Sequence, residues 1–336
     1  MRLFRVPSIT SELLRALLQK EQIMKHTYSR RKILDVGVRS LGAAALGSSF
    51  APSLSAQAPE AAGSITRIDM GYAWLLQGAG CNAVVIPGMS EDGPMLIDGG
   101  LAEHSDALLA AVFDITGKER IHTLVNTHYH PEQTGSNERI GAAGGVIIAH
   151  ENTKMCLQNS VLSWNSEGRY GPLADAGIPN QVISGDGHLK FAGQEIIYGY
   201  LPAAHTNGDI FMYFPILDTL VCGGPVTVGQ WPVLDIRQGA WMGGLVSAYE
   251  ELARIVSADT IVIPAHGPII NGGKIIRMRN MYSELHLTLS EQLNIGMGYD
   301  DIVAQNPLRA FEDEYGSAAE FLEAAHRSIQ MAYVPD

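Results

Sequence analysis

The feature that most restricts how this chain folds is a series of short apolar runs, each leading to a side chain able to bind a metal ion. The side chains in question are Asp98, His128, His130, His205 and His266. Apolar runs of this length predict β-strands. Helical patterns separate the runs from about residue 65 onward, so we expect an α/β fold of mixed sheets covered by helices.

Apolar periodicity and turn residues place the elements along the chain. We expect strands at 83–87, 95–98, 122–126, 145–149, 194–201, 210–214, 219–222 and 260–264. We expect helices at 101–117, which ends at a glycine, and at 245–256. The chain from about residue 275 is expected to be mainly helical, with breaks near 296–299 and 306–307.

The segment 126–137 reads Asn-Thr-His-Tyr-His-Pro-Glu-Gln-Thr-Gly-Ser-Asn and follows a predicted strand directly. Two histidines two residues apart, on a loop that leaves a strand, can turn both imidazoles toward one point. Imidazole is the common neutral ligand of zinc and related metals. A His-x-His pair alone is weak evidence, but His205 in Ala-Ala-His-Thr-Asn-Gly-Asp and His266 in Pro-Ala-His-Gly-Pro strengthen it.

In this order, the segments resemble the signatures of the metallo-β-lactamase superfamily: an aspartate after an early strand, H-x-H-x-D-H, His-Thr-x-Gly-Asp, Gly-Asp and Gly-His-Gly. The resemblance covers roughly residues 65–270. It implies the αβ/βα four-layer sandwich of that family, with two packed β-sheets, helices outside and the site at one edge of the sheets. Residues 59–336 are then one such domain, with a helical C-terminal extension from about residue 275.

The resemblance assigns the first metal site of the family to His128, His130 and His205, which are all present. Three imidazoles that leave a fourth position open for water are typical of a catalytic zinc site. We therefore expect one zinc ion per chain, while iron remains an alternative because imidazole also suits it.

The second metal site of the family is depleted in this sequence. Glu132 and Gln133 stand where the signature has Asp and His, and Gly224 or Pro225 stands where it has the bridging Asp. A neutral amide is a poor ligand, and without a bridging carboxylate nothing offsets the repulsion between two close dications. A second metal is therefore expected to bind weakly or not at all, although His266 is retained.

The remaining polar residues receive roles from the same resemblance. Glu132 is expected to act as a general base toward water or to orient it, and His266 to hydrogen-bond an oxyanion or a substrate carboxylate. The alternative is that both are held in a site that does not turn over. Asp98 is expected to fix a neighbouring ligand by a hydrogen bond. Cys222 is either a soft ligand or, as is commoner for a lone cysteine at a strand end, part of the core.

Trp231 and Trp241 lie in a segment rich in tryptophan and glycine, shortly after the missing bridging position. In the family that the sequence resembles, loops near this point wall the substrate cleft, so both rings are candidates for an apolar wall. Packing in the core or in loops is an equally good interpretation of two large aromatic side chains.

The first 58 residues predict an export signal, for which Met24 is a natural start. Residues 29–34 read Ser-Arg-Arg-Lys-Ile-Leu, a mildly apolar stretch follows from 36 to 50, and small residues precede Ala58. This order is that of a secretory signal, and the paired arginines resemble the twin-arginine type. We expect a periplasmic or secreted protein; the alternative is a basic tail before the domain.

Charge and hydropathy argue against two classes of partner. The formal net charge is −12, and the first 58 residues hold nine of the 23 basic and three of the 35 acidic side chains, so the remainder carries −18. Such an acidic surface repels nucleic acid and anionic lipid. No apolar run reaches the roughly 18 residues of a membrane span, so stable membrane insertion is not expected. The expected partner is a small-molecule substrate.

The function that this pattern predicts is hydrolysis of a small ester, thioester, lactone or amide by water activated on the three-histidine metal site. Two alternatives from other classes stay open. One is a periplasmic accessory protein that binds a metal or ligand without turnover, and the other is an iron-dependent redox enzyme.

Overall fold

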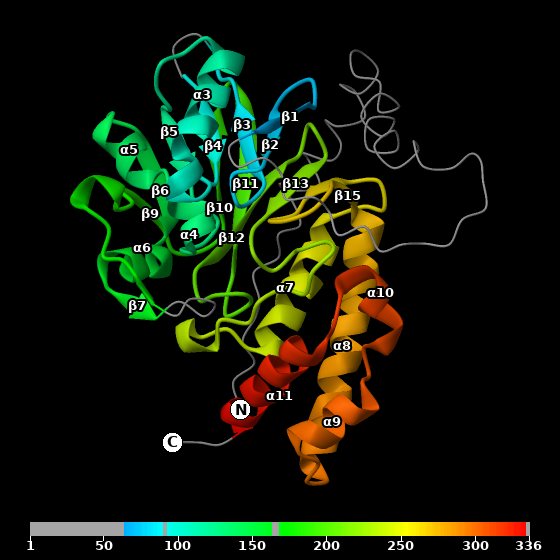
Figure 1. Ribbon diagram of the computed structural model, residues 1–336. Coiled ribbons are helices and arrows are strands. Elements are labelled where there is room, and N and C mark those ends of the chain that lie inside the picture. The colour runs from blue at the N-terminus through cyan, green and yellow to red at the C-terminus, as the bar shows by residue number, and fades with distance from the viewer. Residues whose placement is uncertain (1–63, 90–92, 163–167, 334–336) are drawn as a thin grey trace, which may run out of the picture.

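The computed structural model describes residues 64–89, 93–162 and 168–333, so the expected export signal at 1–58 lies outside the described residues. Two β-sheets face one another, and helices cover the outer face of each (Figure 1). This is the four-layer α/β sandwich that the sequence predicts. Within the described part of the chain, no helix is both long and apolar enough to cross a membrane.

The first sheet has seven strands in the spatial order β1-β2-β3-β4-β5-β6-β9. Neighbouring strands are antiparallel from β1 to β4 and parallel from β4 to β9. The strands are β1 (Thr66–Asp69), β2 (Trp74–Gln77), β3 (Ala83–Ile86), β4 (Met95–Ile97), β5 (Thr123–Val125), β6 (Val146–His150) and β9 (Gln181–Ile183). A separate hairpin joins β7 (Val161–Leu162) to β8 (Arg169–Tyr170).

The second sheet has six strands in sequence order, from β10 to β15. All neighbours are antiparallel except β13 and β14, which run parallel with α7 between them in the chain. The strands are β10 (Gly187–Phe191), β11 (Gln194–Leu201), β12 (Asp209–Phe214), β13 (Thr219–Cys222), β14 (Ile261–Ile263) and β15 (Ile270–Asn271).

Helices and short 3₁₀ turns connect the strands. In the first half of the chain they are η1 (Ala102–His104), α3 (Ser105–Thr116), α4 (Pro131–Thr134), α5 (Asn137–Ala142), α6 (Glu151–Gln158) and η2 (Asp175–Gly177). In the second half they are η3 (Ile236–Gln238), α7 (Met242–Ile255), α8 (Gly272–Asn294), α9 (Tyr299–Gln305), η4 (Arg309–Phe311), α10 (Glu312–Tyr315) and α11 (Ala319–Tyr333). Helix α3 ends as expected, because Gly117 follows it with φ of 64° and caps its C-terminus.

Strand alternation explains how each sheet is buried on both faces. Val84 and Ile86 of β3 belong to the core between the sheets, whereas Val85 belongs to the core beneath α3. In β13, Val221 faces the other sheet, and Leu220 packs toward the C-terminal helices. Strands buried on both faces carry nearly continuous apolar runs, which is why these central strands stood out in the sequence.

The C-terminal helices form the outer layer of the second sheet. Helices α7 and α8 lie side by side, and α11 packs against both (Figure 1). Their shared core includes Leu252, Tyr282 and Phe321, all of them buried. The breaks expected near 296–299 and 306–307 are confirmed, because α8 ends at Asn294 and α9 spans Tyr299–Gln305.

Candidate metal centre

The three histidines of the expected metal site come from two loops at one edge of the sandwich. His128 and His130 follow β5 of the first sheet, and His205 lies between β11 and β12 of the second. A backbone hydrogen bond of 2.9 Å from Ile210 N to Thr127 O ties the two loops together. The site therefore forms where the two sheets meet.

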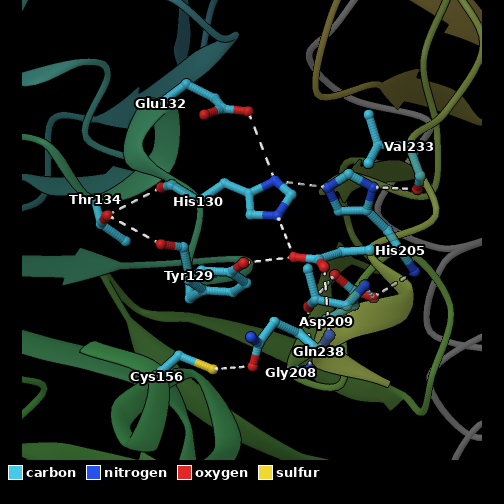
Figure 2. A network of polar contacts seen from close by, with 12 residues as sticks. Tyr129, His130, Glu132, Thr134, Cys156, His205, Gly208, Asp209, Val233 and Gln238 are labelled. Carbon is cyan, nitrogen blue, oxygen red and sulfur yellow. Dashed lines mark hydrogen bonds and ion pairs between the residues drawn. The ribbon is translucent and has the colours of Figure 1, made fainter. Parts of the chain in front are cut away.

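The three imidazoles are buried and converge on one point. One ring nitrogen from each lies within 4.8 Å of the others, and the ring centroids are 4.6–4.8 Å apart. His130 Nδ1 is 3.1 Å from His205 Nε2 (Figure 2). The Nε2 atom of His128 is buried and has no hydrogen-bond partner among the described residues. The inner atoms are thus His128 Nε2, His130 Nδ1 and His205 Nε2.

The outer nitrogen of His128 is held through a threonine. Thr127 donates from its backbone N to Asp98 Oδ1 and from its hydroxyl to Asp98 Oδ2, both at 2.8 Å. The same hydroxyl lies 3.1 Å from His128 Nδ1 and accepts a hydrogen bond from it. Burial raises the pKa of Asp98 to about 8, although the hydrogen bonds from Thr127 act in the opposite direction. Asp98 therefore orients His128 through Thr127.

The outer nitrogen of His205 donates to a backbone carbonyl. His205 Nδ1 is 2.7 Å from Val233 O. The backbone of the same loop is fixed by Asp209, whose carboxylate accepts hydrogen bonds from His205 N and Thr206 N, both at 2.7 Å. Burial raises the pKa of Asp209 to about 7 against these hydrogen bonds. The Asp of the His-Thr-Asn-Gly-Asp segment thus shapes the loop that presents His205.

The outer nitrogen of His130 contacts a carboxylate to which sequence reasoning assigned no role. His130 Nε2 lies 3.2 Å from Oδ2 of Asp235, a fully buried residue that also accepts a 2.5 Å hydrogen bond from Tyr129 Oη. Asp235 fixes the tautomer of His130 and so turns its Nδ1 lone pair inward. The only sequence signal is an acidic residue close after Trp231, and such a residue has no distinguishing spacing.

The histidines have the protonation that metal ligands need. Burial, reinforced by the neighbouring imidazoles, holds the pKa values of His128 and His205 well below the ordinary value. Both rings are therefore neutral at physiological pH. Each ring also directs its outer nitrogen to an acceptor, so its inner nitrogen carries the lone pair.

The donor set fits a tetrahedral metal such as zinc. Zinc–nitrogen distances of about 2.0–2.1 Å place tetrahedral ligand nitrogens about 3.3 Å apart, close to the 3.1 Å between His130 Nδ1 and His205 Nε2. The unpartnered Nε2 of His128 is a buried polar atom that a metal ion would satisfy. Three protein ligands leave a fourth position for a small molecule.

A cavity of about 320 Å³ opens onto this site. Its polar lining comes from Glu132, His205, Thr227, Gln230 and His266. Glu132, on α4, places Oε1 3.7 Å from His130 Nδ1 (Figure 2). Burial and His130 lower the pKa of His266 against the opposing effect of Glu132. The structure thus places Glu132 and His266 in one cavity with His205.

Gly224, one of the two positions expected for a bridging carboxylate, has no room for a side chain, and Pro225, the other, has no ligating side chain. A Cβ atom at Gly224 would lie 1.9 Å from Cδ2 and 2.3 Å from Nε2 of His205. Gln133, which replaces a family histidine, is fully buried, and its amide has no hydrogen-bond partner among the described residues. Cys222 belongs to the buried core beneath the C-terminal helices and is absent from the described metal-binding cluster. The structure therefore favours the core interpretation of Cys222.

The two tryptophans lie in different places. Trp231 lines the cavity together with Leu101 and Val233. Trp241 precedes α7 and contacts the ring of His286 edge-on, with centroids 5.8 Å apart. It is not among the residues that line the cavity. The expectation of a wall built from both rings is corrected for Trp241, because α7 begins directly after it and its ring lies against α8.

Comparisons with known proteins agree with this architecture. A family model described as "Metallo-beta-lactamase superfamily" matches residues 76–268. A metallo-beta-lactamase from Pontibacter korlensis aligns with a TM-score of 0.52 at 18% identity, over 66% of this chain and 99% of that one. The sec-alkylsulfatase Pisa1 from Pseudomonas sp. aligns with a TM-score of 0.51 at 18% identity, over 70% of this chain and 44% of that one. No curated protein matches the chain significantly. At these identities the solved structures show the fold alone.

Proposed function

Because the chain belongs to the metallo-β-lactamase superfamily, we propose that it is a metal-dependent hydrolase of a small ester, thioester, lactone or amide. The proposed cofactor is one zinc ion held by His128, His130 and His205. The observation that carries the proposal is the convergence of three buried imidazoles, each with its outer nitrogen engaged, at a cavity that also contains Glu132 and His266.

The proposed reaction divides between the cofactor and the protein. When bound, a divalent metal polarises a carbonyl and lowers the pKa of a water molecule. The protein must then move protons, and Glu132 is the one carboxylate among the described residues that line the cavity. Its Oε1 accepts the proton of the attacking water and returns it to the leaving group as the acyl bond breaks.

His266 supplies a hydrogen bond to the reacting carbonyl. Its lowered pKa keeps the ring neutral at physiological pH, so one ring nitrogen carries a proton. That N–H donates to the carbonyl oxygen as negative charge develops on it. The backbone that carries this ring is fixed by a hydrogen bond, because Val228 N donates to His266 O at 3.1 Å.

Of the two positions that could carry the bridging carboxylate, Pro225 has no ligating side chain, so the proposal of a single metal rests on Gly224. The ring of His205 occupies the space in which a side chain at this position would begin. A bridging carboxylate therefore cannot stand there while His205 keeps its place. Without that anion, a second dication close to the first is unfavourable.

The test combines metal content with turnover. Zinc-loaded protein is assayed with p-nitrophenyl acetate, a thioester and a γ-lactone. Glu132→Gln is expected to lower kcat by a factor of about a hundred to ten thousand at unchanged metal content, whereas His128→Ala loses metal and activity together. Glu103→Gln, an exposed carboxylate outside the cavity, is the matched control.

Glu132→Asp distinguishes a base from a weakened metal ligand. A shorter side chain retracts from the water and lowers activity if Glu132 is a base. It raises affinity for a second metal if Glu132 is a ligand. Full turnover in Glu132→Gln, or activity lost only in proportion to metal, contradicts the proposed role.

A further inference from the structure

The described lining of the cavity carries a negative formal charge. Among the described residues that line it, Glu132 carries the only formal charge, and no lysine or arginine is present. Among the described residues that line the cavity, an anionic group would therefore find no basic side chain to pair with.

The protein also offsets the positive charge of a bound metal. Two carboxylates approach the same imidazole, Asp235 at 3.2 Å from His130 Nε2 and Glu132 at 3.7 Å from His130 Nδ1. Two carboxylates at these distances offset the positive charge of a dication held by the three imidazoles. The metal therefore presents little net attraction to a distant anion, while Glu132 repels one at close range.

Part of the cavity lining is apolar and firmly held, because Trp231 lines the cavity. Trp231 Nε1 donates to Gly316 O at 3.0 Å. The indole ring stacks with Tyr315 and Phe321, at centroid distances of 4.8 and 5.2 Å. A fixed flat ring of this kind suits an apolar or aromatic group and gives no hydrogen bond to an anion, because its N–H is already used.

We propose that the substrate is an uncharged acyl compound whose apolar group lies against Trp231, and that Glu132 excludes carboxylate, sulfate and phosphate groups. This inference rests on the proposed function, because it assumes that the reacting group binds at the three histidines. The volume of about 320 Å³ limits the substrate to a small molecule.

Thiols test this inference without turnover, because a thiolate binds zinc directly. Mercaptoacetamide and mercaptoacetate have nearly the same shape and differ by one negative charge. Calorimetric titration of zinc-loaded protein is expected to show about tenfold tighter binding of the amide. Glu132→Gln is expected to remove most of that preference by strengthening the binding of mercaptoacetate.

Benzyl mercaptan tests the apolar wall. Trp231→Leu is expected to weaken its binding about fivefold, whereas the control Trp241→Leu, whose ring lies outside the cavity, leaves it unchanged. If zinc-loaded wild-type protein binds mercaptoacetate as tightly as mercaptoacetamide or more tightly, the inference is overturned but the proposed function is not. Protein that retains no metal overturns the proposed function, and the inference fails with it.

Discussion

Asp235 provides the sharpest test of how the metal site is built. Its buried carboxylate contacts His130 Nε2 at 3.2 Å and Tyr129 Oη at 2.5 Å. Asp235→Asn keeps the shape of the side chain and removes the charge that holds His130 in its metal-binding orientation. Replacing such a partner of a ligating histidine commonly lowers metal affinity by about 10–100-fold, which is about 1.4–2.8 kcal/mol of binding free energy.

The assay is competition for zinc against a chromophoric chelator. Tyr129→Phe removes one hydrogen bond to Asp235 but leaves its carboxylate on His130, so its loss of affinity is expected to be smaller. Asp218→Asn is the matched control. This buried aspartate accepts hydrogen bonds from Tyr213 and Thr260, and it precedes β13, at the strand end opposite to Gly224.

The melting temperature of metal-free protein separates an effect on the site from an effect on the fold. Asp218→Asn is expected to lower the melting temperature without changing zinc affinity. Zinc affinity that stays at the wild-type value in Asp235→Asn would refute the assignment of Asp235 as the residue that positions His130. An equal loss of zinc affinity in the control Asp218→Asn would also refute this assignment.

Three further outcomes are expected. Elemental analysis should find close to one tightly bound metal per chain, and its removal by a chelator should lower the melting temperature, because a ligand that binds the native state stabilises it. Gly224→Asp should weaken zinc binding at least about tenfold, since its Cβ displaces the ring of His205; two bound metals would contradict this. We also propose that a precursor is cut near Ala58 and that Arg30→Lys with Arg31→Lys blocks export; an uncut cytoplasmic protein in the natural host would contradict it.

The sequence predicted several central elements well because they carry the apolar run of a strand or the apolar periodicity of a helix. The strand expected at 194–201 matches β11 residue for residue. The helix expected at 245–256 overlaps α7 and extends one residue past its end. Strands β1 and β10 escaped prediction. Their residues are exposed or half-buried except Phe191, so they lack the apolar run that marks a strand.

The candidate metal site was predictable only where residue type and spacing are both restricted. The ligands His128, His130 and His205 follow recognisable strands in recognisable motifs. The partners of their outer nitrogens do not, because a backbone carbonyl such as Val233 O has no sequence signature. Asp235 is 105 positions from His130 in the chain, and only the fold brings them together.

The role of the C-terminal helices could not be predicted either, because these helices contain no recognisable motif. The metal ligands lie well before α8, so the helices beyond it supply no imidazole to the cluster. They supply instead the carbonyl of Gly316 and the rings of Tyr315 and Phe321 that hold Trp231 at the cavity. The three imidazoles and the residues that hold Trp231 therefore come from separate parts of the chain. Substitutions in the extension can change which ligands fit without changing the ligands of the metal.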